Sequence, residues 1–296
     1  MKMLLVYNPL AGHGRAGKML LQVETALNEN GIEFDLQLTD YPEHGIEIVK
    51  NADLSKYDGI VAAGGDGTLY EVINGYYQNP GARKVPIGIL PIGTGNAFAR
   101  DLDLDNTKWK EAIKIIARQK THKVDVGKFQ THGQDFYYLN ILGLGFVADV
   151  TYTANKLKLL GNISYTLGVL YRTLFLGTNK FKFEIDGQHF ERECTFVEIS
   201  NTRYTANFLM APRAKIDDGL LDVIIAAKLS RVRLLKCFPK IFTGEHVNLK
   251  EVETFQAKHI KIESATPKVL TPDGELMGIT PVEIECLPQA IEVYWK

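Results

Sequence analysis

The hydrophobic pattern of the chain changes once, near Asp125, and this change constrains the fold more than any other feature of the sequence. Before it, short continuous apolar runs alternate with segments of helical spacing; after it, strand-like segments follow one another between turn residues. Buried strands separated by helices are typical of a parallel sheet that is covered on both faces. Alternating strands joined by turns are typical of an antiparallel sandwich or barrel. We therefore predict two domains, residues 1–125 and residues 126–296.

Each predicted element rests on its own periodicity. In the first domain we expect strands at Met3–Tyr7, Phe34–Leu38, Gly59–Ala63 and Ile87–Leu90, and helices at Lys18–Asn28, His44–Lys50, Leu69–Tyr77, Ala97–Leu102 and Lys108–Arg118. In the second domain we expect strands at Phe181–Ile185, Phe196–Ile199, Leu221–Ala226, Ile260–Ile262, Val282–Leu287 and Ile291–Trp295, and helices at Tyr152–Leu176 and Arg231–Phe242.

Composition excludes several classes of partner and site. The formal net charge is -1, from 34 Lys and Arg against 35 Asp and Glu, so no overall field attracts nucleic acid. The 3 cysteines, Cys194, Cys237 and Cys286, are far apart and show no metal-ligand spacing, which indicates buried thiols in a reducing compartment. No segment approaches the roughly 20 apolar residues of a membrane-spanning helix. We expect a cytoplasmic protein.

The strongest local signal is the sequence Gly-Gly-Asp-Gly-Thr, residues 64–68, between a buried strand and a helix. Glycines allow the backbone to turn sharply and to approach a ligand closely. The N-terminus of the following helix offers free N–H groups and a partial positive charge to an anion. Phosphate fits this description, and Asp66 would then face a cation such as Mg²⁺. The alternative is a glycine turn in which Asp66 only caps the helix.

Two further loops end strands of the same predicted sheet. Pro91–Asn96 contains Gly93, Thr94 and Gly95, and Asn8–Arg15 follows the first strand. Ligands of open parallel sheets collect at the carboxyl edge of the strands, so these loops predict a nucleotide site. The chain contains no GxxxxGK[ST] sequence, which excludes a Walker A site. Arg15 and Lys18 are candidates for phosphate contact or for a solvated helix start.

Taken in order, these motifs resemble a known family. NPLAGHGR, GGDGT and PIGTGNAFAR, followed by the segment APRAKIDDGL at 211–220 and by TPDGE at 271–275, are similar to the diacylglycerol kinase and sphingosine kinase catalytic domain. Bacterial soluble lipid kinases are the most similar members. The resemblance covers nearly the whole chain. It implies a nucleotide-binding α/β domain like that of NAD kinases and phosphofructokinases, followed by a mainly antiparallel β-sandwich that receives the lipid.

The resemblance also implies roles for individual residues. Glu275, which closes the Asp-Gly-Glu motif, would accept a proton, with Asp273 beside it and Asp66 completing the catalytic set. Lys215, Asp218 and Leu220 would hold a structural Mg²⁺. The residues that would contact ATP are Asn8, Thr39, Gly64, Gly65, Asp66, Gly67, Thr68, Gly93, Thr94 and Asn96.

One position departs from the family pattern. Many bacterial relatives have Asn-Asp-Phe after the second glycine loop, whereas this chain has Asn96-Ala97-Phe98. In those relatives the missing carboxylate belongs to a network around the structural metal, and sphingosine kinases carry alanine in a similar place. The change puts the structural Mg²⁺ and the acceptor lipid in question.

The Asp-Gly-Glu motif also fits phosphoryl transfer on chemical grounds, independently of the family resemblance. Phosphoryl transfer to a hydroxyl needs one group that takes the proton, and a carboxylate of raised pKa serves this purpose. The alternative for Asp273-Gly274 is a hairpin turn with an exposed Glu275.

A second set of apolar residues is a candidate for contact with lipid. Leu160, Ile163, Leu167, Leu170, Tyr171, Leu174 and Phe175 have helical spacing, with Lys156, Lys158, Arg172, Lys180 and Lys182 around them. Such a helix either lies at a membrane interface or packs on the sheet of the second domain. The segment Arg231–Lys240 allows the same two interpretations.

We expect an ATP- and Mg²⁺-dependent kinase that phosphorylates a lipid hydroxyl transiently at the inner membrane surface, with diacylglycerol as the first candidate. A sphingoid base or another hydroxylated lipid is the nearest alternative acceptor. Further alternatives are a kinase of a soluble acceptor such as NAD, and a nucleotide- and lipid-binding protein without turnover. An exposed sheet edge would allow a homodimer, and the sequence does not decide the oligomeric state.

Overall fold

The computed structural model of the chain describes residues 1–156 and 164–296, and the side chains of all of these except residues 154–156, 164–166 and 170. The chain forms two compact units. Unit 1 contains Met1–Val124 and Gln289–Lys296, and unit 2 contains Asp125–Pro288. From the sequence we assigned all residues after 125 to the second domain. In the structure the C-terminal segment, Gln289–Lys296, belongs to unit 1. There Val293 pairs in parallel with Ile87, an arrangement that no local pattern reveals.

Unit 1 contains the predicted parallel sheet. Its strands lie in the order β2-β1-β3-β4, and each neighbouring pair is parallel. The inner strands are buried along almost their whole length, which explains their continuous apolar sequences. The strand bounds are β1 Lys2–Tyr7, β2 Glu33–Leu38, β3 Gly59–Gly64 and β4 Ile87–Pro91.

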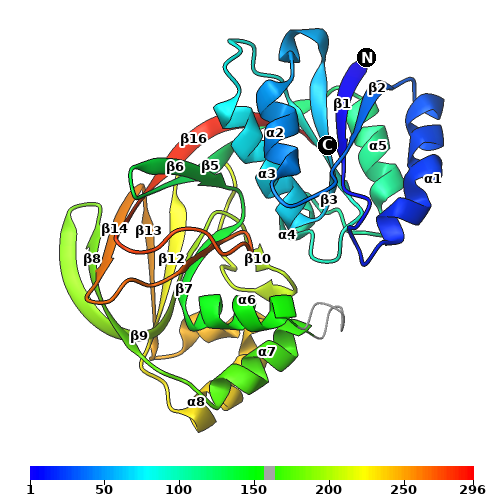
Figure 1. The fold of residues 1–296 in the computed structure, drawn as a ribbon. Coiled ribbons are helices and arrows are strands. Elements are labelled where there is room, and N and C mark those ends of the chain that lie inside the picture. The colour runs from blue at the N-terminus through cyan, green and yellow to red at the C-terminus, as the bar shows by residue number, and fades with distance from the viewer. Residues whose placement is uncertain (157–163) are drawn as a thin grey trace. The chain divides into compact units, whose positions relative to one another are not determined.

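Helices cover both faces of this sheet (Figure 1). Helices α2 and α3 pack together on one face, and α1 and α5 pack together on the other. The helix bounds are α1 Arg15–Glu29, α2 His44–Asn51, α3 Asp66–Gln78, α4 Ala97–Asp101 and α5 Trp109–Ala117, with a 3₁₀ turn at Leu54–Lys56. Each predicted helix of the first domain is present, with ends shifted by a few residues.

Unit 2 is built on antiparallel strands. Its main sheet has the order β13-β12-β9-β8-β14-β16, and β9 also pairs with β7, which in turn pairs with β15. Strand β5 begins in unit 1 and pairs with β6 and β16 in unit 2. The bounds are β5 Thr121–Thr131, β6 Gln134–Tyr138, β7 Ile141–Gly145, β8 Asn179–Ile185, β9 Gln188–Ser200, β10 Tyr204–Thr205, β11 Phe208–Leu209, β12 Leu221–Ala227, β13 Val252–Ala257, β14 His259–Ser264, β15 Leu270–Pro272 and β16 Val282–Tyr294.

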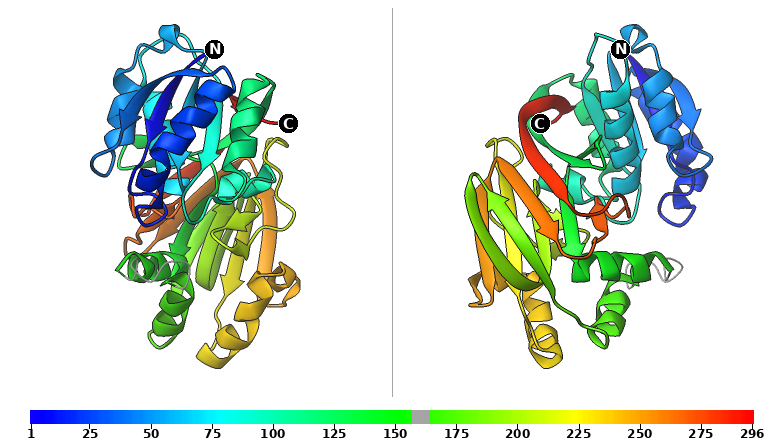
Figure 2. Two further views of the ribbon diagram at one scale, coloured as in Figure 1. Left: turned by 90° about the vertical axis from the view of Figure 1, so that its right-hand side faces the viewer. Right: turned by 60° about the vertical axis from the view of Figure 1, so that its left-hand side comes forward.

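The two faces of the unit 2 sheet carry two different cores. In β12, Val223 and Ile225 point into a core made by the strands, while Ile224 and Ala226 point into a second core. Helices α6, α7 and α8 contribute to the second core and lie beside one end of the sheet (Figure 2). Their bounds are α6 Phe146–Lys156, α7 Ser164–Thr173 and α8 Arg231–Cys237, and 3₁₀ turns follow at Phe238–Ile241 and Glu245–Asn248.

Several predicted elements of the second domain have different bounds in the structure. The segment Tyr152–Leu176 contains the end of α6 and all of α7, and residues 157–163 lie outside the described part. Helix α8 ends at Cys237 and continues as a 3₁₀ turn that contains Pro239. The two predicted C-terminal strands are one long strand, β16. No helix in the described part of the chain is long and apolar enough to cross a bilayer.

Candidate active site

The three glycine-containing loops of unit 1 meet at the carboxyl ends of β1, β3 and β4. The N–H group of Asn8 donates to the carbonyl of Ala63 at 3.0 Å, which joins the first loop to the end of β3. The N–H groups of Ile92 and Gly93 donate to the carbonyl of Gly64 at 3.1 Å and 2.8 Å. The parallel pairing of the strands thus brings segments from three parts of the sequence together, as the sequence predicted.

The contact between the second and third loops requires glycine. A Cβ atom on Gly93 would lie 2.4 Å from the Cα atom of Gly65 and 2.7 Å from its nitrogen. The two backbones therefore touch directly. A Cβ atom on Gly95 would lie 2.6 Å from Oδ2 of Asp66. Partly exposed backbone at Gly65, Gly67 and Gly95 is left at the surface of this junction, where an anion can approach it.

Asp66 is the first residue of α3 and joins the two loops electrostatically. Its Oδ1 accepts a hydrogen bond from the N–H group of Ala97 at 2.7 Å, at the start of α4. The 13-residue helix α3 begins with Gly65 as its N-cap, and no side chain caps it. The positive end of the helix dipole therefore faces the same junction.

Several predicted nucleotide contacts also shape the loops themselves. The side chain of Asn8 donates to Oγ1 of Thr68 at 3.2 Å, and its oxygen accepts from the N–H group of Leu10 at 2.9 Å. Asn96 has a left-handed backbone and donates from its side chain to the carbonyl of Gly93 at 3.0 Å. Thr39 is buried, and its N–H group donates to the carbonyl of Tyr7. Their contact with a nucleotide stays a prediction.

Arg15 has a role that the sequence did not reveal. Its guanidinium donates to the carbonyl oxygens of Ile92 at 3.1 Å and Gly93 at 3.3 Å. The side chain therefore fastens the first loop to the third. Arg15 is also exposed, and its contact with phosphate stays a prediction.

In unit 2, the Asp-Gly-Glu motif forms a tight turn after β15. The carboxylate of Asp273 is buried and accepts hydrogen bonds from the N–H groups of Leu139 at 3.0 Å, Asn140 at 2.8 Å and Ile141 at 3.0 Å. Glu275 is exposed, and its N–H group donates to the carbonyl of Pro272 at 2.8 Å. The two carboxylates thus differ: Asp273 is buried and holds the turn, whereas Glu275 is exposed.

Asp125 and Asn201 connect this turn to the predicted metal segment, and sequence reasoning missed both. The buried carboxylate of Asp125 accepts from the N–H group of Gly219 at 2.7 Å. The side chain of Asn201 donates to the carbonyl oxygens of Asp125 and Leu139, both at 3.0 Å. The one available signal was a carboxylate between two apolar residues, Val124 and Val126.

The predicted metal ligands lie in one turn of unit 2. The carboxylate of Asp218 is exposed and accepts from the N–H group of Leu220 at 3.1 Å, and Lys215 is also exposed. Carbonyl and carboxylate oxygens are the ligands that Mg²⁺ takes, so the donor chemistry fits. Burial, and then the charge of Asp218, raises the pKa of nearby Asp222 to about 6. Within the described residues, no three Asp, Glu, His or Cys side chains gather as a metal site.

A buried carboxylate lies on the helix-covered face of the unit 2 sheet. Glu198 in β9 accepts hydrogen bonds at Oε1 from Thr205 at 2.6 Å and Ser200 at 3.2 Å. Burial raises the pKa of Glu198 to about 7, although both hydroxyl donors oppose the shift. This group was not singled out from the sequence.

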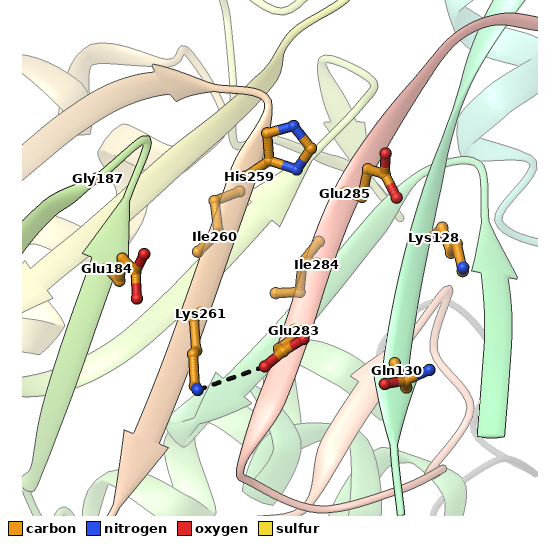
Figure 3. A pocket seen from close by; sticks show the side chains of 10 residues that line it. All are labelled: Lys128, Gln130, Glu184, Gly187, His259, Ile260, Lys261, Glu283, Ile284 and Glu285. Carbon is orange, nitrogen blue, oxygen red and sulfur yellow. Dashed lines mark ion pairs between the residues drawn. The ribbon is translucent and has the colours of Figure 1, made fainter. Parts of the chain in front are cut away.

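Unit 2 also has an open pocket of about 360 Å³ (Figure 3). Its wall carries Glu184 and Lys128, and an ion pair of 3.3 Å joins Lys261 to Glu283. None of the predicted site residues lines it. The charged lining is unsuited to an acyl chain.

Comparison with known proteins decides the family. The diacylglycerol kinase catalytic domain model matches residues 2–129, and the YegS C-terminal NAD kinase β-sandwich-like domain model matches residues 140–295. A diacylglycerol kinase of Mycobacterium tuberculosis (strain ATCC 25618 / H37Rv) is 31% identical over 297 residues, covering 99% of this chain and 94% of the relative. The chain belongs to the diacylglycerol kinase family. It is a phosphotransferase that uses an alcohol group as acceptor.

Other relatives agree with this family assignment. A diacylglycerol kinase of Bacillus subtilis (strain 168) is 30% identical over 292 residues, which cover 98% of this chain and 94% of the relative. The crystal structure of a diacylglycerol kinase from Bacillus anthracis str. Sterne superposes with a TM-score of 0.75 at 25% identity, covering 100% and 97% of the two chains. An NAD kinase from Archaeoglobus fulgidus, at 13% identity and a TM-score of 0.55, shares the fold. The predicted family and fold class are confirmed.

Proposed function

We propose that this member of the diacylglycerol kinase family transfers the γ-phosphoryl group of ATP to a lipid hydroxyl, with diacylglycerol as acceptor. The observation that carries the proposal is the meeting of three loops, Asn8–Arg15, Gly64–Thr68 and Ile92–Asn96, at the carboxyl edge of a parallel sheet. The relatives named diacylglycerol kinase, which match almost the full chain, support the lipid acceptor.

In this proposal the backbone of the loops binds the phosphates. The N–H groups of Gly65–Thr68, at the start of α3, and of Thr94 face the triphosphate, and Gly93 allows the close approach of the loop backbone. Asp66 would hold Mg²⁺, which neutralises the charge on the phosphate oxygens when bound. A second, structural Mg²⁺ would be held by Asp218 with the carbonyl oxygens of Lys215 and Leu220.

Glu275 takes the proton of the acceptor hydroxyl in the transfer step. The hydroxyl oxygen forms a bond to the γ-phosphorus, and the bond from this phosphorus to the β–γ bridging oxygen breaks. The products are ADP and the phosphorylated lipid, and the proton resides on Glu275 until solvent removes it. Asp273 positions this turn, because its carboxylate already accepts three backbone N–H groups.

The test is transfer of labelled γ-phosphate from ATP to a panel of acceptors. Diacylglycerol in mixed micelles should be phosphorylated, and a sphingoid base and NAD should be poor acceptors. Glu275→Gln should bind ATP like the wild type, and its turnover should fall by roughly 10²-fold or more. If NAD or a sphingoid base is phosphorylated faster than diacylglycerol, the proposed acceptor is wrong. If Glu275→Gln turns over like the wild type, Glu275 does not accept the proton.

A further inference from the structure

A row of three residues crosses neighbouring strands on the helix-covered face of unit 2. Glu198 in β9 lies directly opposite Gly143 in β7, and Gly143 lies directly opposite Thr271 in β15. Directly opposite residues of antiparallel strands point to the same face of a sheet, so the side chains of Glu198 and Thr271 share this face. A Cβ atom on Gly143 would lie 2.8 Å from Cγ2 of Thr271, which agrees with this placement. We call these three residues the Glu198 row.

Both polar side chains of the Glu198 row are buried and incompletely hydrogen-bonded. Thr271 is 0% exposed, and its Oγ1 atom has no hydrogen-bond partner among the described residues. Glu198 is 1% exposed, and both of its hydrogen bonds, from Thr205 and Ser200, reach Oε1; within the described part of the chain none reaches Oε2. Buried polar groups are nearly always paired, because an unpaired one costs free energy. Two such groups in one row indicate a site whose ligand completes their hydrogen bonds.

The free oxygen of Glu198 is a hydrogen-bond donor in the acid form. The two lone pairs of Oε1 already accept from two hydroxyl groups, so the proton of the acid belongs on Oε2. Burial raises the pKa of Glu198 to about 7, so the acid form is well populated at neutral pH. The O–H group at Oε2 therefore lacks an acceptor.

The surroundings of the Glu198 row are apolar. Glu198 lies directly opposite Ile224 in β12, and both Ile224 and Phe196 belong to the second core of unit 2. Helix α6 contacts β7, β9 and β15, so it covers the row. A Cβ atom on Gly143 would lie 2.7 Å from Cγ1 of Val147 in α6, and Val147 is partly exposed. The row thus lies one side chain below the surface.

The helices over this face include part of the segment that we expected to contact lipid. Val169 of α7 and Leu234 of α8 belong to the same second core. The exposed apolar residues of the expected set are Leu167, Tyr171, Leu174 and Phe175. The members that fall outside the described residues are Leu160, Ile163 and Lys158, with the side chains of Leu170 and Lys156. Contact of the exposed residues with a membrane stays a prediction, on which the Glu198 row does not depend.

The Glu198 row is connected to the turn that carries the proposed proton acceptor. Thr271 begins the TPDGE segment, which ends at Glu275. The turn is fixed to the end of β7, because the N–H group of Asp273 donates to the carbonyl of Ile141 at 2.9 Å. A lipid whose hydroxyl lies at Glu275 therefore has the Glu198 row as the adjoining part of unit 2.

We propose that Glu198 selects the lipid acceptor by donating a hydrogen bond from Oε2 to an ester carbonyl, with Oγ1 of Thr271 as a second polar contact. An ester carbonyl accepts hydrogen bonds and donates none, which complements the acid, and the acyl chains beside it suit the apolar surroundings. A sphingoid base has no carbonyl group, and its ammonium group would need the ionised carboxylate. The inference rests on the proposed function for the position of the transferred phosphoryl group.

The test compares two acceptors that differ only at the ester groups. Diacylglycerol and its dialkyl ether analogue carry the same free hydroxyl, and both are presented to the full-length protein in the same detergent micelles. The wild type should favour the ester roughly tenfold in kcat/KM, because the ether leaves a buried donor unpaired. Glu198→Met, which is unbranched, apolar and similar in length, should phosphorylate ester and ether equally. Glu198→Gln should keep the preference, because its amide still accepts at Oε1 and donates beside it.

Two further variants complete the comparison. Thr271→Val keeps the shape of the side chain without its hydroxyl, so it should reduce the ester preference, and it also tests the row if Glu198→Met does not fold. Glu191→Met removes an exposed carboxylate from the same strand and should leave the preference unchanged. The ratio of the two acceptors is the decisive readout, since a general loss of stability lowers both rates together.

The outcomes separate this inference from the proposed function. If the wild type phosphorylates ester and ether equally, or if Glu198→Met and Thr271→Val keep the full ester preference, water alone completes the row and the inference is wrong. A preference for a sphingoid base that is lost in Glu198→Gln would also overturn it, because the carboxylate would then bind an amine. If the wild type phosphorylates no lipid, the proposed function fails. Equilibrium binding of fluorescent diacylglycerol, with the unlabelled ester and ether as competitors, then tests the row by itself.

Discussion

Replacement of Gly93 by alanine should separate the two loops that form the candidate phosphate site. The new Cβ atom would lie 2.4 Å from Cα of Gly65, whereas ordinary contact begins at 3.4 Å, so the loops must move apart by about 1 Å. The obstacle is backbone, which cannot rotate away as a side chain can. A displacement of about 1 Å in a catalytic site can cost roughly 10²-fold in rate. The strain should lower the free energy of unfolding by about 1–3 kcal/mol.

The same loop pair provides a matched variant. A Cβ atom on Gly65 would meet Cα of Gly93 at 3.5 Å, which is ordinary contact, and the backbone of Gly65 does not need glycine. Gly65→Ala should therefore melt like the wild type and yet weaken ATP binding, because its methyl group stands where phosphate approaches. Gly177→Ala, which meets no atom within 4 Å, is the neutral control.

Calorimetric titration of ATP with Mg²⁺, combined with thermal melting, distinguishes these outcomes. Gly93→Ala should lose both affinity and stability, Gly65→Ala affinity alone, and Gly177→Ala neither. Wild-type ATP affinity in Gly93→Ala would refute the argument, because the loop contact would then have no part in nucleotide binding.

Three further variants test other contacts of the described structure. Arg15→Lys keeps the positive charge, but an ammonium group cannot bridge the carbonyl oxygens of Ile92 and Gly93 as the guanidinium does. ATP affinity, measured by titration, should therefore fall roughly tenfold. Unchanged ATP affinity would indicate that Arg15 acts only through its charge on phosphate. Asp273→Asn leaves one backbone N–H without an acceptor, so stability should fall by about 1–3 kcal/mol and kcat should fall while KM for ATP holds. Because burial raises the pKa of Glu198 from 4.5 to about 7, its folded form holds a proton that the unfolded form releases. The stabilisation from this proton is complete below pH 4.5 and is lost as the pH rises to 7. Glu198→Gln should therefore remove on the order of 3 kcal/mol from the change in unfolding free energy between these pH values. An unchanged pH dependence would contradict this.

The first half of the fold could be predicted because its signals are local. Strands such as β3 are buried on both faces and read as continuous apolar runs, and each helix carries its own periodicity. The segment from Thr121 to Tyr138 was missed because Lys, Asp and Gly interrupt its apolar alternation. Strand β16 was divided into two because Pro288 resembles a break, although the strand continues through it.

The site could be predicted only where the same short stretch of sequence indicates both a turn and a binding function. The glycine loops could be recognised from the sequence, since the close approach of the two backbones demands glycine at position Gly93. The clamp from Arg15 spans 77 residues to Ile92, and Asp273 meets Asn140 across 133 residues. Such contacts depend on which strands lie next to each other in the sheet. The order of strands in a sheet cannot be inferred from local sequence patterns.

Hydrogen exchange of the backbone amides, measured with and without ATP and Mg²⁺, tests the central claim most directly. The account predicts that ATP slows exchange in peptides that cover Gly64–Thr68 and Ile92–Asn96, and leaves the β10–β11 hairpin, Tyr204–Leu209, unchanged. Slowed exchange around the charged pocket of Figure 3, with no change in the two glycine loops, would contradict it.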